Sequence, residues 1–234
     1  MERLETPTKE NLDYSMPESS GGGGFGANIK SKLSGLSNWT FGVTKFILGV
    51  FLLPYVCSST VSFINELGVI DKTSQHYFLV GIISLIVVHL FIWEPAIIYS
   101  RGHKLLEFVF SYFKPLVKVA PYLLPIYTIV LFLVYLVMSL FVKSPELVHY
   151  FIFLFSFMTT MHLVFSAKTL RSKKNDFLKG NYIFGFAFVY LVNLMIVSFF
   201  LNIIFDKFSF VNFSNQAYLI AKGIFHDLFK QLFL

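Results

Sequence analysis

Five apolar runs constrain this chain more than any other feature of its sequence. They cover approximately residues 46–67, 77–98, 119–142, 147–167 and 182–205. About 20 apolar residues in a helix cross the roughly 30 Å hydrocarbon core of a bilayer, so each run is long enough to span a membrane. Only 14% of the 234 residues are charged, against about 25% in soluble domains. The sequence therefore predicts an all-α polytopic membrane protein with a five-helix transmembrane bundle.

The basic residues predict the orientation of the five spans. Three segments that would lie on one side of the membrane contain five, four and five Lys or Arg: residues 1–45, 99–118 and 168–181. The three segments on the opposite side contain one, one and three: residues 68–76, 143–146 and the chain after residue 205. Loops rich in Lys and Arg stay in the cytoplasm. We therefore expect the N-terminus inside and the C-terminus outside.

Two connections predict local structure. The link KSPEL, residues 143–147, is short, with Ser144 placed as an N-cap and Pro145 at the first helical position. It predicts an antiparallel hairpin of the third and fourth spans. In the connection RGHKLLEFVFSYFKP, polar residues recur every three or four positions from Lys104 to Lys114. This period predicts an amphipathic helix on the cytoplasmic face, ended by Pro115.

The two ends of the chain have contrasting compositions. Residues 1–40 are polar and rich in Gly and Ser, which is typical of a flexible arm rather than of a secretory signal. The spans occupy residues 41–207. Residues 208–234 form a separate segment in which Lys222, His226 and Lys230 recur every four positions. This pattern predicts an amphipathic helix in the outer interface, with a partner-binding helix and a sixth span as the alternatives.

Four polar residues inside the spans are the candidate functional groups: His89, Glu94, His162 and Asn193. At a rise of 1.5 Å per residue, the predicted topology puts Glu94 level with His162 at a depth of about 9 Å. The same estimate puts His89 level with Asn193 at about 16 Å. Ionisable residues in a membrane are costly to bury and often functional.

Several roles for these residues stay open. A His beside a carboxylate titrates near neutral pH, so Glu94 and His162 could handle protons from the cytoplasm. Met158 and Met161 next to His162 offer soft ligands for copper(I), although no pattern predicts a bound cofactor or metal. Alternatively, Glu94 is an interfacial charge at a helix end before Pro95, and the two histidines form hydrogen bonds between helices.

Three classes of function remain. The first is a non-enzymatic accessory or scaffold subunit, in contact with lipid and with a membrane-protein partner or a second copy. The second is a small proton-coupled transporter or channel. The third is a membrane enzyme acting on lipid, which would need a second carboxylate or His cluster near Glu94 that the sequence does not provide. A nucleic-acid surface is not expected, because the basic segment 168–181 has little aromatic content. A bacterial cytoplasmic membrane is the expected location.

Overall fold

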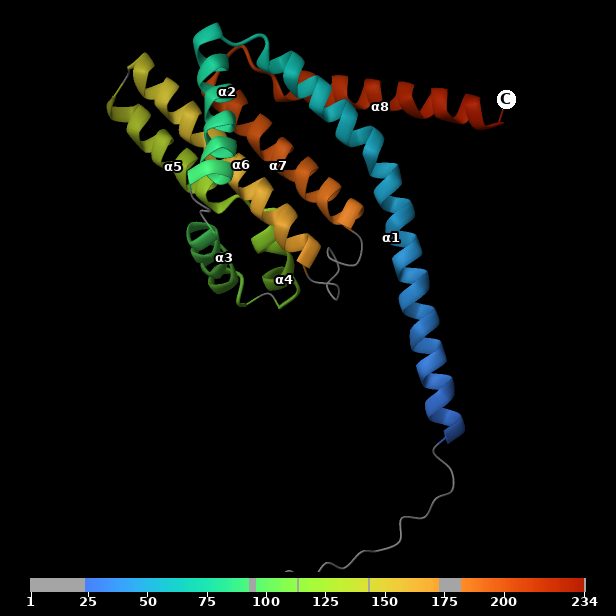
Figure 1. Ribbon diagram of the computed structural model, residues 1–234. Coiled ribbons are helices and arrows are strands. Elements are labelled where there is room, and N and C mark those ends of the chain that lie inside the picture. The colour runs from blue at the N-terminus through green and yellow to red at the C-terminus, as the bar shows by residue number, and fades with distance from the viewer. Residues whose placement is uncertain (1–23, 93–95, 113, 143, 173–181, 234) are drawn as a thin grey trace, which may run out of the picture. The chain divides into compact units, whose positions relative to one another are not determined.

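The computed structural model of the chain describes residues 24–92, 96–112, 114–142, 144–172 and 182–233. Two compact units divide the chain, Met1–Thr40 and Phe41–Leu234. Every regular element in the described ranges is a helix (Figure 1). The helices are α1 (Gly24–Leu67), α2 (Lys72–Val87), the π-helix η1 (Val88–Ile92), α3 (Ala96–Val109), α4 (Lys114–Leu123), α5 (Ile126–Phe141), α6 (Pro145–Ser172), α7 (Tyr182–Ile204) and α8 (Phe210–Phe233).

Among the described residues, four helical stretches are long and apolar enough to cross a membrane: Thr40–Leu67, Lys72–Phe91, Pro145–Arg171 and Tyr182–Ile204. They correspond to the first, second, fourth and fifth predicted runs. The all-helical class and the multi-pass pattern are therefore confirmed. The fifth apolar helix, α5, has only 16 residues.

The prediction that residues 119–142 form one continuous helix is wrong. Helix α4 ends at Leu123, and α5 begins at Ile126. Pro125 lies between them, and its missing backbone N–H and ring prevent the helix from continuing. The sequence reading overlooked the effect of this proline.

The second run also ends differently from the prediction. After η1, residues 93–95 lie outside the described residues, and Glu94 is one of them. Helix α3 then begins at Ala96, eight residues before Lys104, and it ends at Val109 rather than at Pro115. Pro115 lies instead in the first turn of α4. Backbone N–H groups in the first turn have no acceptor within the helix, so a proline there costs no hydrogen bond.

At the N-terminal end, helix replaces part of the predicted arm. Helix α1 begins at Gly24, so residues 24–40 are helical although their Gly and Ser content predicted a flexible linker. The sequence ANIKSKL within this segment has no Pro or Gly, so propensity there does not oppose a helix. Residues 1–23 lie outside the described residues.

Helices α2 and α6 are in extensive contact with each other. Gly81 makes this approach possible, because a Cβ at residue 81 would overlap the Ser156 hydroxyl and the Phe153 carbonyl oxygen of α6. The contacts between α5 and α6 confirm the predicted hairpin, and α6 begins at Pro145 as expected. Small residues let membrane helices pack at short range in this way.

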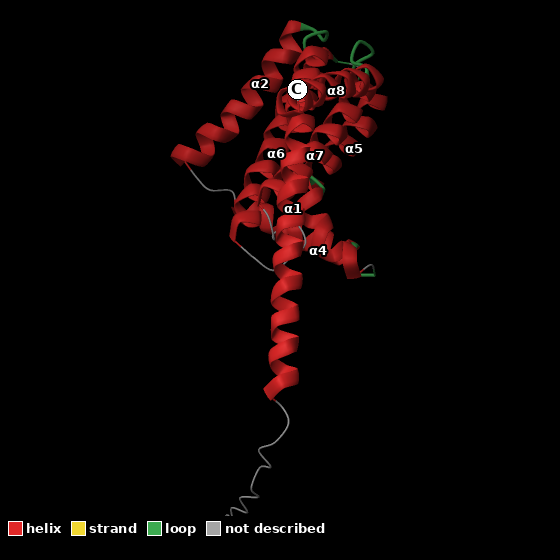
Figure 2. Ribbon diagram, turned by 90° about the vertical axis from the view of Figure 1, so that its right-hand side faces the viewer, coloured by secondary structure: helices red, strands yellow, loops and turns green. Residues whose placement is uncertain are grey.

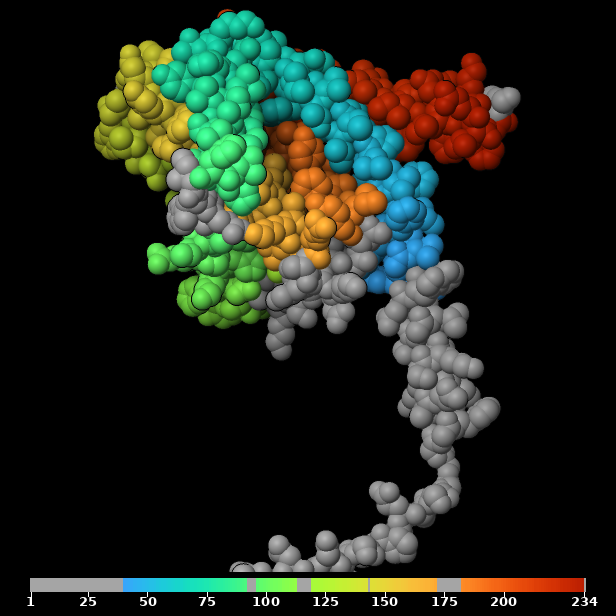
Figure 3. Space-filling view, in the orientation of Figure 1, coloured from blue at the N-terminus to red at the C-terminus, as the bar shows by residue number. Residues whose placement is uncertain are grey.

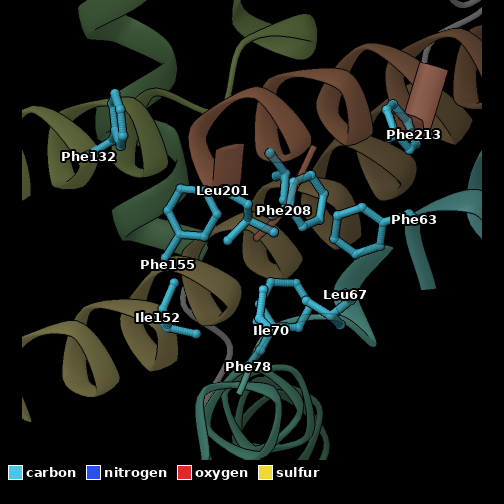
Figure 4. Packing of buried hydrophobic residues seen from close by; sticks show 11 residues of the cluster. Phe63, Leu67, Ile70, Phe78, Phe132, Ile152, Phe155, Leu201, Phe208 and Phe213 are labelled. Carbon is cyan, nitrogen blue, oxygen red and sulfur yellow. The ribbon is translucent and has the colours of Figure 1, made fainter. Parts of the chain in front are cut away.

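A cluster of aromatic and aliphatic side chains joins six helices at one end of the bundle (Figure 4). Phe63 of α1, Phe78 of α2, Phe155 of α6 and Leu201 of α7 are among its buried members. Figure 1 places α3 and α4 at the opposite end of the bundle. Phe208, in the connection between α7 and α8, is buried in the cluster, so the start of α8 is fixed to the bundle.

The predicted C-terminal helix is present as α8, which starts at Phe210. It is not among the four helices long and apolar enough to span. In Figure 2, α8 is seen nearly end-on while α6 and α7 run from top to bottom, so α8 crosses their direction. This direction fits an interfacial helix better than a sixth span.

Asp71 provides the N-cap of α2, and its removal is expected to weaken that helix. The carboxylate accepts a hydrogen bond of 2.8 Å from the backbone N–H of Ser74. Burial alone would raise the pKa of Asp71, but the hydrogen bonds to its carboxylate and the nearby His149 together outweigh this effect, so the pKa lies below its usual value. Asp71→Ala should lower the free energy of unfolding by about 1 kcal/mol at pH 7, measured by thermal unfolding in detergent.

The pH dependence follows from the direction of that pKa shift. The pKa of Asp71 is lower in the folded state than in the unfolded state. The carboxylate therefore contributes fully to the free energy of unfolding at pH values above its unfolded pKa of about 3.9. This contribution is lost as the pH falls through the folded pKa. Asp71→Asn keeps an acceptor oxygen but has no charge. The difference in the free energy of unfolding between this variant and the wild type should therefore become smaller below about pH 4. A difference that stays constant across this range would contradict the assignment.

Candidate functional site

The break between α4 and α5 exposes backbone carbonyl groups inside the bundle. Because Pro125 has no N–H, and the N–H of Ile126 donates to Leu124 O at 3.0 Å, the carbonyl groups at the end of α4 are left to other donors. A carbonyl group without a donor inside a membrane costs several kcal/mol, on the order of a lost hydrogen bond or more. The neighbouring helices must therefore supply donors here.

Two of the four candidate residues supply them. His162 of α6 lies with Nε2 3.1 Å from Tyr122 O. Asn193 of α7 donates from Nδ2 to Leu123 O at 3.0 Å and to Val189 O of its own helix at 2.8 Å. Both side chains are buried. His162 and Asn193 thus act on consecutive carbonyl groups, and each holds the end of α4 against a different helix.

Ser166, one turn after His162, reinforces the first contact. Its hydroxyl donates to Tyr122 O at 3.3 Å and lies 3.4 Å from His162 Nε2. The imidazole donates to a carbonyl only when Nε2 carries the proton. The hydrogen-bond partner of His162 therefore favours the tautomer protonated at Nε2.

Helix α3 closes the polar region from the side. The Tyr99 hydroxyl lies 3.2 Å from Ser166 Oγ, and its ring centroid is 6.0 Å from that of His162. Tyr127 of α5 donates to Ile98 O at 2.5 Å. His103 lies 4.8 Å from the Tyr122 ring, centroid to centroid. The break is therefore surrounded by hydroxyl and imidazole groups from α3, α5 and α6 and by the Asn193 amide of α7.

A small cavity beside His162 is bounded by Tyr99, His103, Pro121 and Tyr127, among others. The volume open to the centre of a water molecule is about 10 Å³, roughly what one water requires. The Nε2 atom of His103 lies 3.4 Å from a carboxylate oxygen of Glu107 on the same helix. The cavity can hold a water near titratable groups, but it is too small for a solute.

The predicted pairing of the candidate residues receives no support from the described part of the chain. Glu94 lies outside it, so its distance from His162 stays untested. His89 packs its ring against Phe165, with centroids 5.5 Å apart, whereas Asn193 contacts α4. The two residues have different surroundings rather than a common polar layer.

The methionines near His162 have packing roles. Met161 is buried beside Leu85 and Phe165, and Met158 packs against the same cluster. Within the described residues, no three His, Cys, Asp or Glu side chains come together as metal ligands. The copper(I) alternative gains no supporting contact.

The sequence reading missed a second polar site, at the start of α8. Glu66, buried near the end of α1, accepts a hydrogen bond of 3.1 Å from Ser209 N. Ser62, one turn earlier, donates to Phe213 O at 2.7 Å. A carboxylate at a helix N-terminus is stabilised by the helix dipole. The position of Glu66 in the last turn of the first run was the available signal.

Comparisons with protein-family models, with curated proteins and with solved structures find no match for this chain.

Proposed function

We propose that this chain is a non-enzymatic accessory or scaffold subunit of a membrane complex. The observation that carries the proposal is the use of His162 and Asn193 as hydrogen-bond donors to the broken α4–α5 segment. Two of the four candidate residues therefore form hydrogen bonds that hold the helices together. A subunit that positions other proteins needs a rigid interior of this kind and an accessible surface.

That surface is α8. Its start is held by Glu66 and Ser62, whereas its second half is largely uncovered on the face seen in Figure 3. Leu219 is 63% exposed and Phe233 is 77% exposed. Apolar side chains on an amphipathic helix are the usual anchors for a partner groove. We propose α8 as the contact with a partner membrane protein.

The orientation and location belong to the same proposal. The uneven distribution of Lys and Arg supports a cytoplasmic side at α3 and α4 and an outer side at α8. We propose a bacterial cytoplasmic membrane as the location.

Purification in a gentle detergent from native membranes tests the partner contact. Wild type is expected to co-purify with a membrane protein in a fixed ratio, and removal of residues 215–234 should abolish this. The deletion keeps the anchor at Ser209 and Phe213, so the bundle should remain folded. Leu219→Glu should give the same loss through one exposed side chain, while Gly223→Ala, whose Cβ would contact nothing within 4 Å, should keep the partner.

Recovery of the wild-type chain alone would overturn the proposal. A small proton-coupled transporter or channel is the second candidate, favoured by the water-sized cavity beside His162. Proton flux into proteoliposomes, compared between wild type, Glu94→Gln and His162→Ala, tests that candidate directly.

A further inference from the structure

We propose that a groove between α1, α7 and α8 binds one acyl chain of an anionic phospholipid, with Lys222 at the lipid headgroup. The groove has a volume of about 380 Å³ and is lined almost entirely by apolar atoms. Leu52 and Tyr55 come from α1, Leu191 and Met195 from α7, and Ala217 and Tyr218 from α8. The groove would bind lipid whether or not α8 also contacts a partner protein.

The groove exists because α8 contacts α1 at two separated points. At one point Ser62 donates to Phe213 O at 2.7 Å. At the other, the Phe225 ring centroid lies 5.5 Å from that of Tyr55. Between these points the lining side chains include the small residues Ser59, Ser214 and Ala217. Small side chains between two fixed contacts leave a space that neither helix fills.

The lining and the position of the groove favour an acyl chain. Its walls are almost entirely apolar, and apolar surface is stabilised by contact with hydrocarbon rather than with water. The groove borders the candidate span Thr40–Leu67 and the candidate span Tyr182–Ile204, where acyl chains surround the protein.

The charge on α8 favours an anionic headgroup. Lys222 is exposed and follows Tyr218, a groove residue, by one helical turn. Side chains four residues apart lie on the same face of a helix. Helix α8 carries Lys222 and Lys230 against the acidic residue Asp227. A lysine near the membrane surface increases affinity for anionic lipid by about fivefold.

Native mass spectrometry of the purified full-length protein tests the site. Phosphatidylglycerol and phosphatidylcholine with identical acyl chains are added to the protein in detergent. We expect one bound phosphatidylglycerol per chain, with about fivefold preference over phosphatidylcholine. Lys222→Gln should remove the preference but keep weak binding of both lipids. Met195→Trp should fill the groove and remove both.

The control variant is Lys207→Gln, an exposed lysine at the same end of the bundle that does not line the groove. It should keep the preference, and an equal loss in Lys207→Gln and Lys222→Gln would overturn the proposal. So would equal binding of the two lipids, or a bound lipid unaffected by Met195→Trp. A second copy of the chain in place of lipid would also overturn it. Met195 is 51% exposed, and the thermal midpoint without lipid checks that its variant folds.

Discussion

Replacing His162 by leucine is expected to lower the free energy of unfolding by about 1–3 kcal/mol. The substitution removes the imidazole donor, which lies 3.1 Å from Tyr122 O, and leaves this carbonyl group with only the longer contact from the Ser166 hydroxyl at 3.3 Å. Asn193→Leu should have an effect of the same size, because it removes the donor to Leu123 O. Unfolding by heat or by SDS in detergent micelles measures both effects.

The conservative variant His162→Gln separates a structural role from a proton-handling role. The glutamine amide can donate to Tyr122 O, so most of the stability should return. It cannot take up a proton near neutral pH. Proton flux that is present in wild type and absent from a stable His162→Gln protein would contradict the structural assignment.

A matched control comes from an exposed histidine. His76 on α2 is exposed, and its ring stands edge-on to that of its neighbour Tyr77. His76→Leu should therefore change the free energy of unfolding by less than about 0.5 kcal/mol. A loss as large as that of His162→Leu would mean that the imidazole contributes through something other than its carbonyl partner.

Gly81→Leu is expected to separate α2 from α6 and to destabilise the bundle by about 3 kcal/mol or more. Even a Cβ at residue 81 would overlap the Phe153 carbonyl oxygen. A backbone atom in the middle of a helix cannot rotate away, so the two helices must move apart. The same unfolding measurement, together with the protease sensitivity of α2, should detect the change.

Gly223→Leu is the control for this substitution. A Cβ at residue 223 would meet nothing within 4 Å, and glycine is about 1 kcal/mol less favourable than alanine inside a helix. Gly223→Leu should therefore leave stability unchanged or raise it slightly. Equal losses for the two variants would show that the close approach of α2 and α6 is not the cause.

Part of the candidate site could be read from the sequence. His162 and Asn193 stood out because polar side chains in apolar runs need partners, and the structure gives both of them one. Their partners could not be predicted, because the receiving groups are backbone carbonyls of Tyr122 and Leu123. Every residue carries such a carbonyl, and only the break at Pro125 makes these two available. Comparing the depths of the four polar side chains in the membrane could not identify these partners, because that comparison did not include backbone groups.

Glu66 shows the same limit. A carboxylate at the end of an apolar run looks like an ordinary interfacial charge, and its burial against Ser209 joins residues 143 positions apart in the chain. Nothing local to Glu66 predicts that contact. Conversely, Asp71 and Pro145 act within their own turns, and the start of α6 at Pro145 was predicted correctly from the short link KSPEL.

The sequence by itself determined the all-helical class, the multi-pass pattern, the α5–α6 hairpin and the helical C-terminal segment. These follow from hydropathy, helical period and chain length, which are local properties. The tertiary structure decided which groups meet: the donors at the α4–α5 break, the Gly81 contact, the Glu66 anchor and the groove beneath α8. These contacts depend on how each helix is rotated and on distances between helices of a few ångströms. An apolar run does not specify either quantity, because side chains that face lipid and side chains that face protein are equally apolar.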